Sequence, residues 1–202
     1  MADIPGIVEA EALLAWAGQQ NPGPWIDHAK TAARAARTIA AHCGMDTERC
    51  YVLGLLHDIG RYEGRNALRH VIKGYDLLMS TGHQKAAEVC LTHSFPLADI
   101  AAFSGQNDCT VEETARISRL LQETFYCDEI RLIQLCDAIS LPQGVTLMEK
   151  RLFDVGMRHS FVAMTGRKWQ EFFHIKAMFD QKCSVNIYQL FREEIVSGIF
   201  NF

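Results

Sequence analysis

The sequence has few of the signals that mark β-strands. Alternating runs of β-branched residues and Asn-Gly hairpin turns are missing, while the helix-forming residues Ala, Leu, Glu, Arg and Gln dominate. Internal repeats and low-complexity segments are missing as well. These absences argue against a sheet protein and against a repeat protein, and we predict an all-α fold.

The sequence also lacks a C-x-x-C pair, an export signal and a long apolar run. Its seven cysteines are scattered and odd in number, which is typical of reduced thiols rather than of a disulfide framework. The N-terminus has no basic region followed by an apolar core, so we expect no signal peptide. No run is apolar for long enough to span a bilayer. We therefore predict a cytoplasmic protein that has no membrane partner.

An excess of positive charge is a third absence. The 20 lysines and arginines are outnumbered by 24 aspartates and glutamates, and the net charge is −4. A general nucleic-acid binder carries the opposite balance, so we do not expect nucleic acid as a partner. The length of 202 residues favours one domain.

Apolar residues recur at helical spacing between breaks rich in proline and glycine. The two clearest breaks are Asn21-Pro22-Gly23-Pro24 and Leu141-Pro142-Gln143-Gly144. We expect helices at about 7–19, 25–43, 47–58, 67–80, 83–91, 111–124, 128–139, 147–157, 167–182 and 185–200. Gly74 is expected to let another helix approach the fourth of these helices closely.

The second break divides the chain into a core and an extension. We predict a helical core over residues 1–140 and a C-terminal helical extension over 141–202, packed on the core as one globular unit. The extension is rich in aromatic residues at helical spacing, which favours packing against the core. An interface is the alternative use of these aromatics, and it leaves a homodimer open.

The most informative dipeptide is His57-Asp58, which ends the apolar run that contains Leu55 and Leu56. Other imidazoles and one other carboxylate lie in similar apolar helical contexts: His28, His70, His93 and Asp137. Imidazole and carboxylate together suit zinc, iron, manganese or nickel. Burial of Asp58 and Asp137 is costly without a cation, which a metal would provide.

Each histidine has a simpler interpretation when taken alone. A single histidine on an apolar helix is more often a hydrogen-bonded core residue than a ligand, and His57-Asp58 alone would fit a helix end bonded to nearby backbone. The ordered series of six residues favours a metal site. The remaining histidines, His42, His83, His159 and His174, have no acidic or histidine partner at a suitable spacing.

The segment from Gly54 to Arg61 resembles the central motif of the HD-domain superfamily of metal-dependent phosphohydrolases. His28 matches the first histidine of that family and Asp137 its last aspartate. His70 and His93 resemble two extra histidines found in the bimetallic branch. The resemblance covers roughly residues 25–140 and implies an HD-domain-like helical bundle.

The resemblance also implies the cofactors, which would be one or two divalent ions of iron, manganese, nickel, cobalt or zinc. The first ion would be held by His28, His57, Asp58 and Asp137. The second would use His70 and His93, with Asp58 as the bridge. If only one ion is bound, His70 or His93 would instead contact the phosphate or donate a proton to the leaving group.

A phosphorylated substrate needs further positive charge near the motif. Arg61 lies one turn past Asp58, and its guanidinium suits phosphate, so we predict that it contacts the reacting group. Arg69 and Lys73 are the other candidates for substrate binding, while Arg65 is interpreted as a surface charge.

We predict a metal-dependent phosphohydrolase that acts on a phosphoester or phosphoanhydride of a nucleotide-like small molecule. Two alternatives stay open. Some HD-like proteins hold two irons and activate oxygen, and others are metal-binding modules without catalysis. Metal identity and redox behaviour would discriminate among the three.

Overall fold

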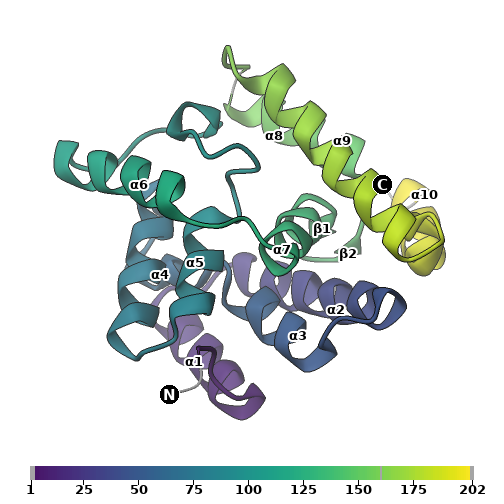
Figure 1. Cartoon of the computed structure of the whole chain (residues 1–202), viewed down its shortest axis with the longest axis horizontal. Coiled ribbons are helices and arrows are strands. Elements are labelled where there is room, and N and C mark those ends of the chain that lie inside the picture. Colours follow the sequence, from purple (N-terminus) through teal and green to yellow (C-terminus); the bar gives the residue numbers. More distant parts are fainter. Residues whose placement is uncertain (1–2, 160, 201–202) are drawn as a thin grey trace.

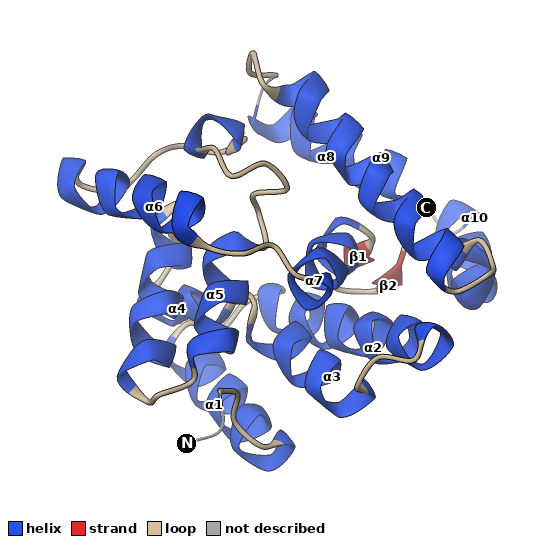
Figure 2. Cartoon of the chain, viewed as in Figure 1, coloured by secondary structure: helices blue, strands red, loops and turns tan. Residues whose placement is uncertain are grey.

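The computed structural model describes residues 3–159 and 161–200, and these form a helical bundle (Figures 1 and 2). The helices of the core are α1 (Ile7–Gln20), α2 (Trp25–Cys43), α3 (Thr47–Leu56), α4 (Arg69–Ser80), α5 (Gln84–Thr92), α6 (Val111–Glu123) and α7 (Asp128–Ala138). The extension contains α8 (Met148–His159), α9 (Thr165–Lys182) and α10 (Arg192–Phe200). The predicted all-α fold is confirmed.

Helix boundaries follow the capping chemistry of the sequence. The Asp46 side chain accepts hydrogen bonds from the amides of Glu48 and Arg49 and so begins α3. Gly44 ends α2 with a φ of 71°, a left-handed conformation that favours glycine. Thr110 and Glu113 form a reciprocal capping box at the start of α6.

Two short helices and one hairpin depart from the predicted helices. Helix α3 ends at Leu56, and the chain continues as the short 3₁₀ helix η1 (Ile59–Glu63) where we expected helix and then loop. The last predicted helix is divided into the 3₁₀ helix η3 (Ile187–Phe191) and α10, while η2 (Ile100–Ala102) lies before α6. Strands β1 (Ser140–Leu141) and β2 (Gly144–Val145) pair antiparallel around the Pro142-Gln143 turn, which we expected only as a break.

The core forms around small residues that let helices approach closely. The buried face of α2 is lined by alanines, and a Cβ on Gly54 would lie 2.5 Å from Cα of Ala33, so α3 packs directly on α2. Helix α7 contacts both α2 and α3, and it lies between them and the extension in Figure 1. This arrangement brings the start of α2, the end of α3 and the end of α7 together.

A second close approach joins η1 to α4. A Cβ on Gly60 would lie under 3.0 Å from the carbonyl oxygen of His70 and the amide nitrogen of Gly74. The expected close approach at Gly74 is therefore confirmed, with η1 as the approaching segment. Because His70 belongs to this contact, the two glycines set the distance between α4 and the residues that follow α3.

The extension shares one apolar core with the first helices. Phe172, Phe179 and Phe191 are buried in the cluster that also contains Leu14 and Leu56. Other aromatic residues of the extension, such as Phe153 and Phe161, are more than half exposed. Packing against the core thus accounts for some of the aromatic residues and not for others.

The helices were also compared with what a lipid bilayer requires. Among those in the described part of the chain, not one combines the length and the apolar character needed to cross a membrane.

Candidate metal centre

Six predicted ligands meet in the interior as two groups of three. His28, His57 and Asp137 form one group, and Asp58, His70 and His93 form the other. In the first, Nε2 of His28 lies 3.0 Å from Oδ1 of Asp137 and 3.3 Å from Nε2 of His57. In the second, Nε2 of His70 lies 3.2 Å from Nε2 of His93. The structure therefore brings together residues that are up to 109 positions apart in the sequence.

Asp58 connects the two groups through its two oxygens. Oδ1 lies 3.2 Å from Nε2 of His70 and 3.4 Å from Nε2 of His93, whereas Oδ2 lies 3.9 Å from Nε2 of His57. A carboxylate can bind one ion through each oxygen. The position of Asp58 thus suits a bridge between two ions.

Three histidines are oriented by the same local bond. Nδ1 of His57 donates to the carbonyl of Gly54 at 2.7 Å, and Nδ1 of His93 donates to that of Cys90 at 2.7 Å. Nδ1 of His70 likewise bonds to the carbonyl of Ala67. A carbonyl only accepts, so each Nδ1 keeps its proton and, in the neutral ring, each Nε2 presents a lone pair. Such backbone bonds commonly orient histidine ligands of metals.

The ligand atoms of the second group suit a bound cation, because without one they are acceptors that face one another. With the proton of each ring on Nδ1, the Nε2 atoms of His70 and His93 are acceptors like Oδ1 of Asp58, yet the three atoms lie 3.2 to 3.4 Å apart. Oδ1 of Asp58 is buried and has no hydrogen-bond partner among the described residues. Lone pairs that converge in this way repel one another, and a divalent ion would turn the repulsion into coordination.

Burial decides the charge states of the ligands. It lowers the pKa of His57 and of His70 to about 4, so both rings are neutral near pH 7. Burial alone would raise the pKa of Asp58, but the charge of Arg61, whose Nε lies 2.7 Å from Oδ2, holds it well below the usual range. Burial likewise opposes ionisation of Asp137, and the bond with His28 outweighs it. The centre thus offers neutral rings at His57 and His70 and charged carboxylates at Asp58 and Asp137, which are the forms that bind metal.

These pKa values predict a loss of stability in acid for the metal-free protein. Between pH 6.5 and about 4 the unfolded chain binds protons at His57 and His70 that the folded protein does not, so stability falls as the pH falls. At pH 5 we expect each of these two histidines to lower the free energy of unfolding by on the order of 1–2 kcal/mol relative to pH 7. Thermal unfolding in chelator from pH 7 to pH 5 measures this.

The matched variants separate the buried rings from the exposed ones. His57→Gln should flatten the dependence of the melting temperature on pH. His174→Gln should leave it unchanged, because the side chain of His174 is 77% exposed. Equal slopes in the wild type and in His57→Gln would contradict the assignment.

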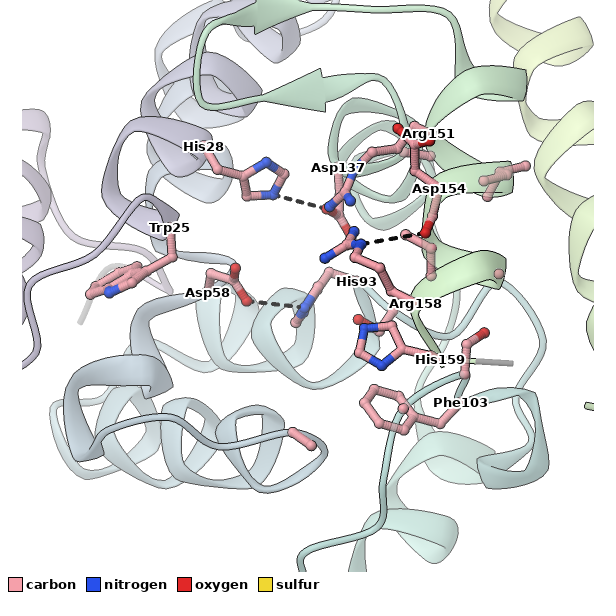
Figure 3. Close-up of a pocket in the computed structure, with 18 of the residues that line it drawn as sticks. Trp25, His28, Asp58, His93, Phe103, Asp137, Arg151, Asp154, Arg158 and His159 are labelled. Carbon is pink, nitrogen blue, oxygen red and sulfur yellow. Dashed lines mark hydrogen bonds and ion pairs between the residues drawn. The ribbon is translucent and has the colours of Figure 1, made fainter. Parts of the chain in front are cut away.

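Five of the six predicted ligands line a cavity of about 950 Å³, in which Figure 3 labels His28, Asp58, His93 and Asp137. His57 is fully buried and does not line it. The opposite wall comes from α8 and α9. Five cationic side chains line the cavity against three carboxylates: Arg61, Arg65, Arg151, Arg158 and Lys168 against Asp58, Asp137 and Asp154. The cavity is therefore cationic although the chain carries a net charge of −4.

The three predicted substrate-binding cations lie in different places. Arg61 lines the cavity and pairs with Asp58. Nε of Arg69 lies 3.2 Å from Glu113, and Nζ of Lys73 lies 3.5 Å from Glu63 and 3.9 Å from Glu113. Neither Arg69 nor Lys73 is among the residues that line the cavity. Arg65, which we interpreted as a surface charge, is exposed and lies at the cavity.

Sequence reasoning missed the cavity residues of the extension. These are Arg151, Arg158, His159 and Lys168, together with the aromatic Trp169. Arg151 and Arg158 are seven residues apart and so share a face of α8, a signal that the sequence contains. Nothing local indicates that this face looks toward the metal ligands.

Three of the four histidines that we did not predict as ligands lie away from the metal centre. Nδ1 of His42 bonds to the carbonyl of Thr38 at 2.9 Å, and Nε2 of His83 lies 3.3 Å from Glu9. His174 faces Glu171. Only His159, of the four, is found among the cavity residues in the described part of the chain.

Comparison with known families agrees with this geometry. The family model described as HD domain matches residues 25–141, a segment that contains all six ligands and ends before α8. Neither the curated proteins nor the solved structures gave a match to the chain. The family model covers more than half of the chain, and its matched segment carries the His and Asp groups of the metal centre. The chain therefore belongs to the HD domain family.

Proposed function

We propose that the protein is a metal-dependent phosphohydrolase that cleaves a phosphoester or phosphoanhydride of a nucleotide-like small molecule. The observation that carries this proposal is the pair of ligand groups joined by Asp58, which opens onto a cavity lined by more cations than carboxylates. HD domain proteins are typically metal-dependent phosphohydrolases, so the family supports the reaction class.

The ligands would hold one or two divalent ions of iron, manganese, nickel, cobalt or zinc. His28, His57 and Asp137 would hold one ion, His70 and His93 the other, and Asp58 would contribute an oxygen to each. Such an ion lowers the pKa of water toward neutrality and offsets the negative charge of a phosphoryl group in the transition state.

Arg61 is the residue of the chain best placed to bind the reacting phosphoryl group. Its Nε faces Asp58 and its Nη1 lies 3.4 Å from the carbonyl of Asn66, so the guanidinium is held beside the ligands. N–H donors that these contacts leave over can bind phosphoryl oxygens. Asp58 thereby orients Arg61 as well as serving the metals. With a single ion, His70 or His93 would first have to gain a proton at Nε2, and could then contact the phosphate or pass that proton to the leaving group.

The rest of the cavity supports a nucleotide-like substrate. Its volume of about 950 Å³ is at the upper end of the range of small-molecule sites. Trp25, Phe103 and Trp169 line it, and such rings can stack on a planar base. The cationic lining suits a phosphate chain.

Metal content and phosphate release test the proposal together. We expect the purified wild type to hold about two ions and to release phosphate from a nucleotide when manganese, nickel or cobalt is supplied. His93→Ala should hold about one ion and lose most activity, because His93 belongs to the second ligand group, where its Nε2 lies 3.2 Å from Nε2 of His70 and 3.4 Å from Oδ1 of Asp58. His83→Ala is the control, since His83 lies away from the cavity.

Each other result favours a different function. One ion in both proteins would indicate a mononuclear enzyme in which His93 contacts phosphate. Iron together with oxygen consumption and no phosphate release would favour the oxygenase alternative. Bound metal with neither activity would favour a non-catalytic module and would contradict the proposal.

A further inference from the structure

Three cations of the extension line the cavity without carboxylate partners. Nε of Arg151 is buried and has no hydrogen-bond partner in the described part of the chain. Nε of Arg158 bonds only the backbone carbonyl of Asp154, at 3.3 Å, one turn before it (Figure 3). Lys168 is only 8% exposed, and its Nζ lies 3.3 Å from the neutral hydroxyl of Ser104. Across residues 3–159 and 161–200, none of the three forms an ion pair.

Two other cations of the same extension are paired with carboxylates. Lys176 lies 2.7 Å from Asp180, and Lys182 pairs with Asp128. The extension therefore contains carboxylates, but they do not neutralise Arg151, Arg158 and Lys168. An unpaired cation in a buried or half-buried place is costly, which applies to Lys168 and Arg151, while Arg158 is exposed at the same wall. An anion that enters the cavity would remove that cost.

The three cations line one cavity, and all three act on the pKa of the same neighbouring histidine. Partial burial and the charges of Arg158, Arg151 and Lys168 lower the pKa of His159, which stands among them. Lys168 in turn is within electrostatic range of Asp137, a ligand of the metal centre. Figure 3 shows Arg151, Arg158 and His159 projecting from α8 toward the cavity that His28 and Asp58 also face. Asp154 is the carboxylate on this wall, and it leaves a net positive charge there.

We propose that Arg151, Arg158 and Lys168 form a second anion site, which binds a phosphate group of the substrate other than the one at the metal centre. The inference rests on the proposed function and narrows its substrate class to compounds with at least two phosphate groups, such as a nucleoside diphosphate or triphosphate. The three residues lie beyond residue 141, where the family match ends, so this site belongs to the extension of this chain. The second anion site would favour such compounds over monophosphates, because a monophosphate can occupy either the metal centre or the second site but not both.

Inorganic phosphate and inorganic triphosphate are the probes that separate the two sites. Titration calorimetry on the full-length purified protein should give an affinity at least tenfold higher for triphosphate than for phosphate. Arg158→Gln should weaken triphosphate binding by about tenfold, as expected for one lost charge-assisted hydrogen bond, and should change phosphate binding by much less. Lys168→Gln should act in the same direction. Arg158 is exposed, so its substitution leaves the packing intact and keeps the test valid if Lys168→Gln does not fold.

Arg167→Gln is the matched control, because it removes an exposed cation next to Lys168 that does not line the cavity. It should bind triphosphate like the wild type. Equal triphosphate affinity in the wild type and Arg158→Gln would overturn the second site. Equal losses in Arg158→Gln and Arg167→Gln would overturn it too, because they would indicate a general effect of charge.

The same measurements distinguish this inference from the proposed function. Binding of triphosphate needs no turnover. A protein that releases no phosphate from any nucleotide would therefore contradict the proposed function, while its triphosphate binding would still test the second anion site. Conversely, an active enzyme that cleaves monophosphates as efficiently as triphosphates, with Arg158→Gln unchanged, would contradict only the second site.

Discussion

The Asp58→Asn variant is expected to lose both metal ions and at least ~10³-fold of turnover. Asp58 places Oδ1 beside His70 and His93 and Oδ2 on the side of His57, so one change removes a charged ligand from both groups. The lost stabilisation of a metal-assisted transition state is several kcal/mol, and each 1.4 kcal/mol is a factor of ten. Elemental analysis and phosphate release measure the two effects.

The variant should remain folded, which separates loss of metal from loss of structure. An amide has the shape of the carboxylate, and its N–H donors can bond the Nε2 atoms that repel Oδ1 in the metal-free protein. Arg61 loses its ionic partner, but the amide oxygen can still accept a hydrogen bond from its buried Nε. The melting temperature in chelator should therefore stay within a few degrees of the wild type.

Asp27→Asn is the control for Asp58→Asn. Asp27 precedes the ligand His28 but is exposed and pairs with Lys30 at 3.0 Å. We expect its metal content and turnover to equal those of the wild type. Two ions retained in Asp58→Asn would show that Asp58 is not the bridge.

The second large effect is expected for Gly60→Ala, which should lower stability by about 3 kcal/mol or more. The added methyl group would overlap the carbonyl of His70 and the amide of Gly74, and both are backbone atoms that cannot rotate away. For a chain of this length that loss corresponds to a fall in melting temperature of roughly 6–12 °C. Thermal unfolding in chelator measures it without the contribution of metal.

Gly60→Ala should also weaken the binding of the second metal ion. Helix α4 must move to make room for the methyl group, and this movement carries His70 away from Asp58. Gly166→Ala, on α9, is the control: a Cβ there meets nothing within 4 Å, so stability should change little or rise slightly. A melting temperature for Gly60→Ala within 2 °C of the wild type would contradict the close approach.

The helices and the ligand types follow from local features of the sequence. Periodic apolar residues, the Asp46 cap and the Gly44 terminator act over a few residues, so they can be recognised without knowledge of the fold. The brief pairing of β1 with β2 and the 3₁₀ geometry of η1 were missed because two or three hydrogen bonds leave no periodic signal. The His and Asp residues were found because each is unusual in an apolar helix.

Apart from Arg61, the cations that line the cavity could not be chosen from the sequence. Arg69 and Lys73 flank His70, which made them candidates, but Glu113 of α6 pairs with both from about 40 residues away. Arg158 and Lys168 are far from every ligand in the sequence, and they reach the cavity because α8 and α9 pack across its mouth. Distance along the chain therefore predicts neither the pairing with Glu113 nor the arrival of Arg158 and Lys168 at the cavity.

By itself, the sequence determined the helical class, most helix ranges and the six residues suited to bind metal, because these depend on helical period and side-chain chemistry. Tertiary structure alone decided how they meet. It sorted the ligands into two groups about Asp58, removed Arg69 and Lys73 from the cavity and placed a cationic wall opposite the centre. The physical reason is that the direction of a helix face is local, whereas the neighbour it faces is set by packing between segments far apart in the chain.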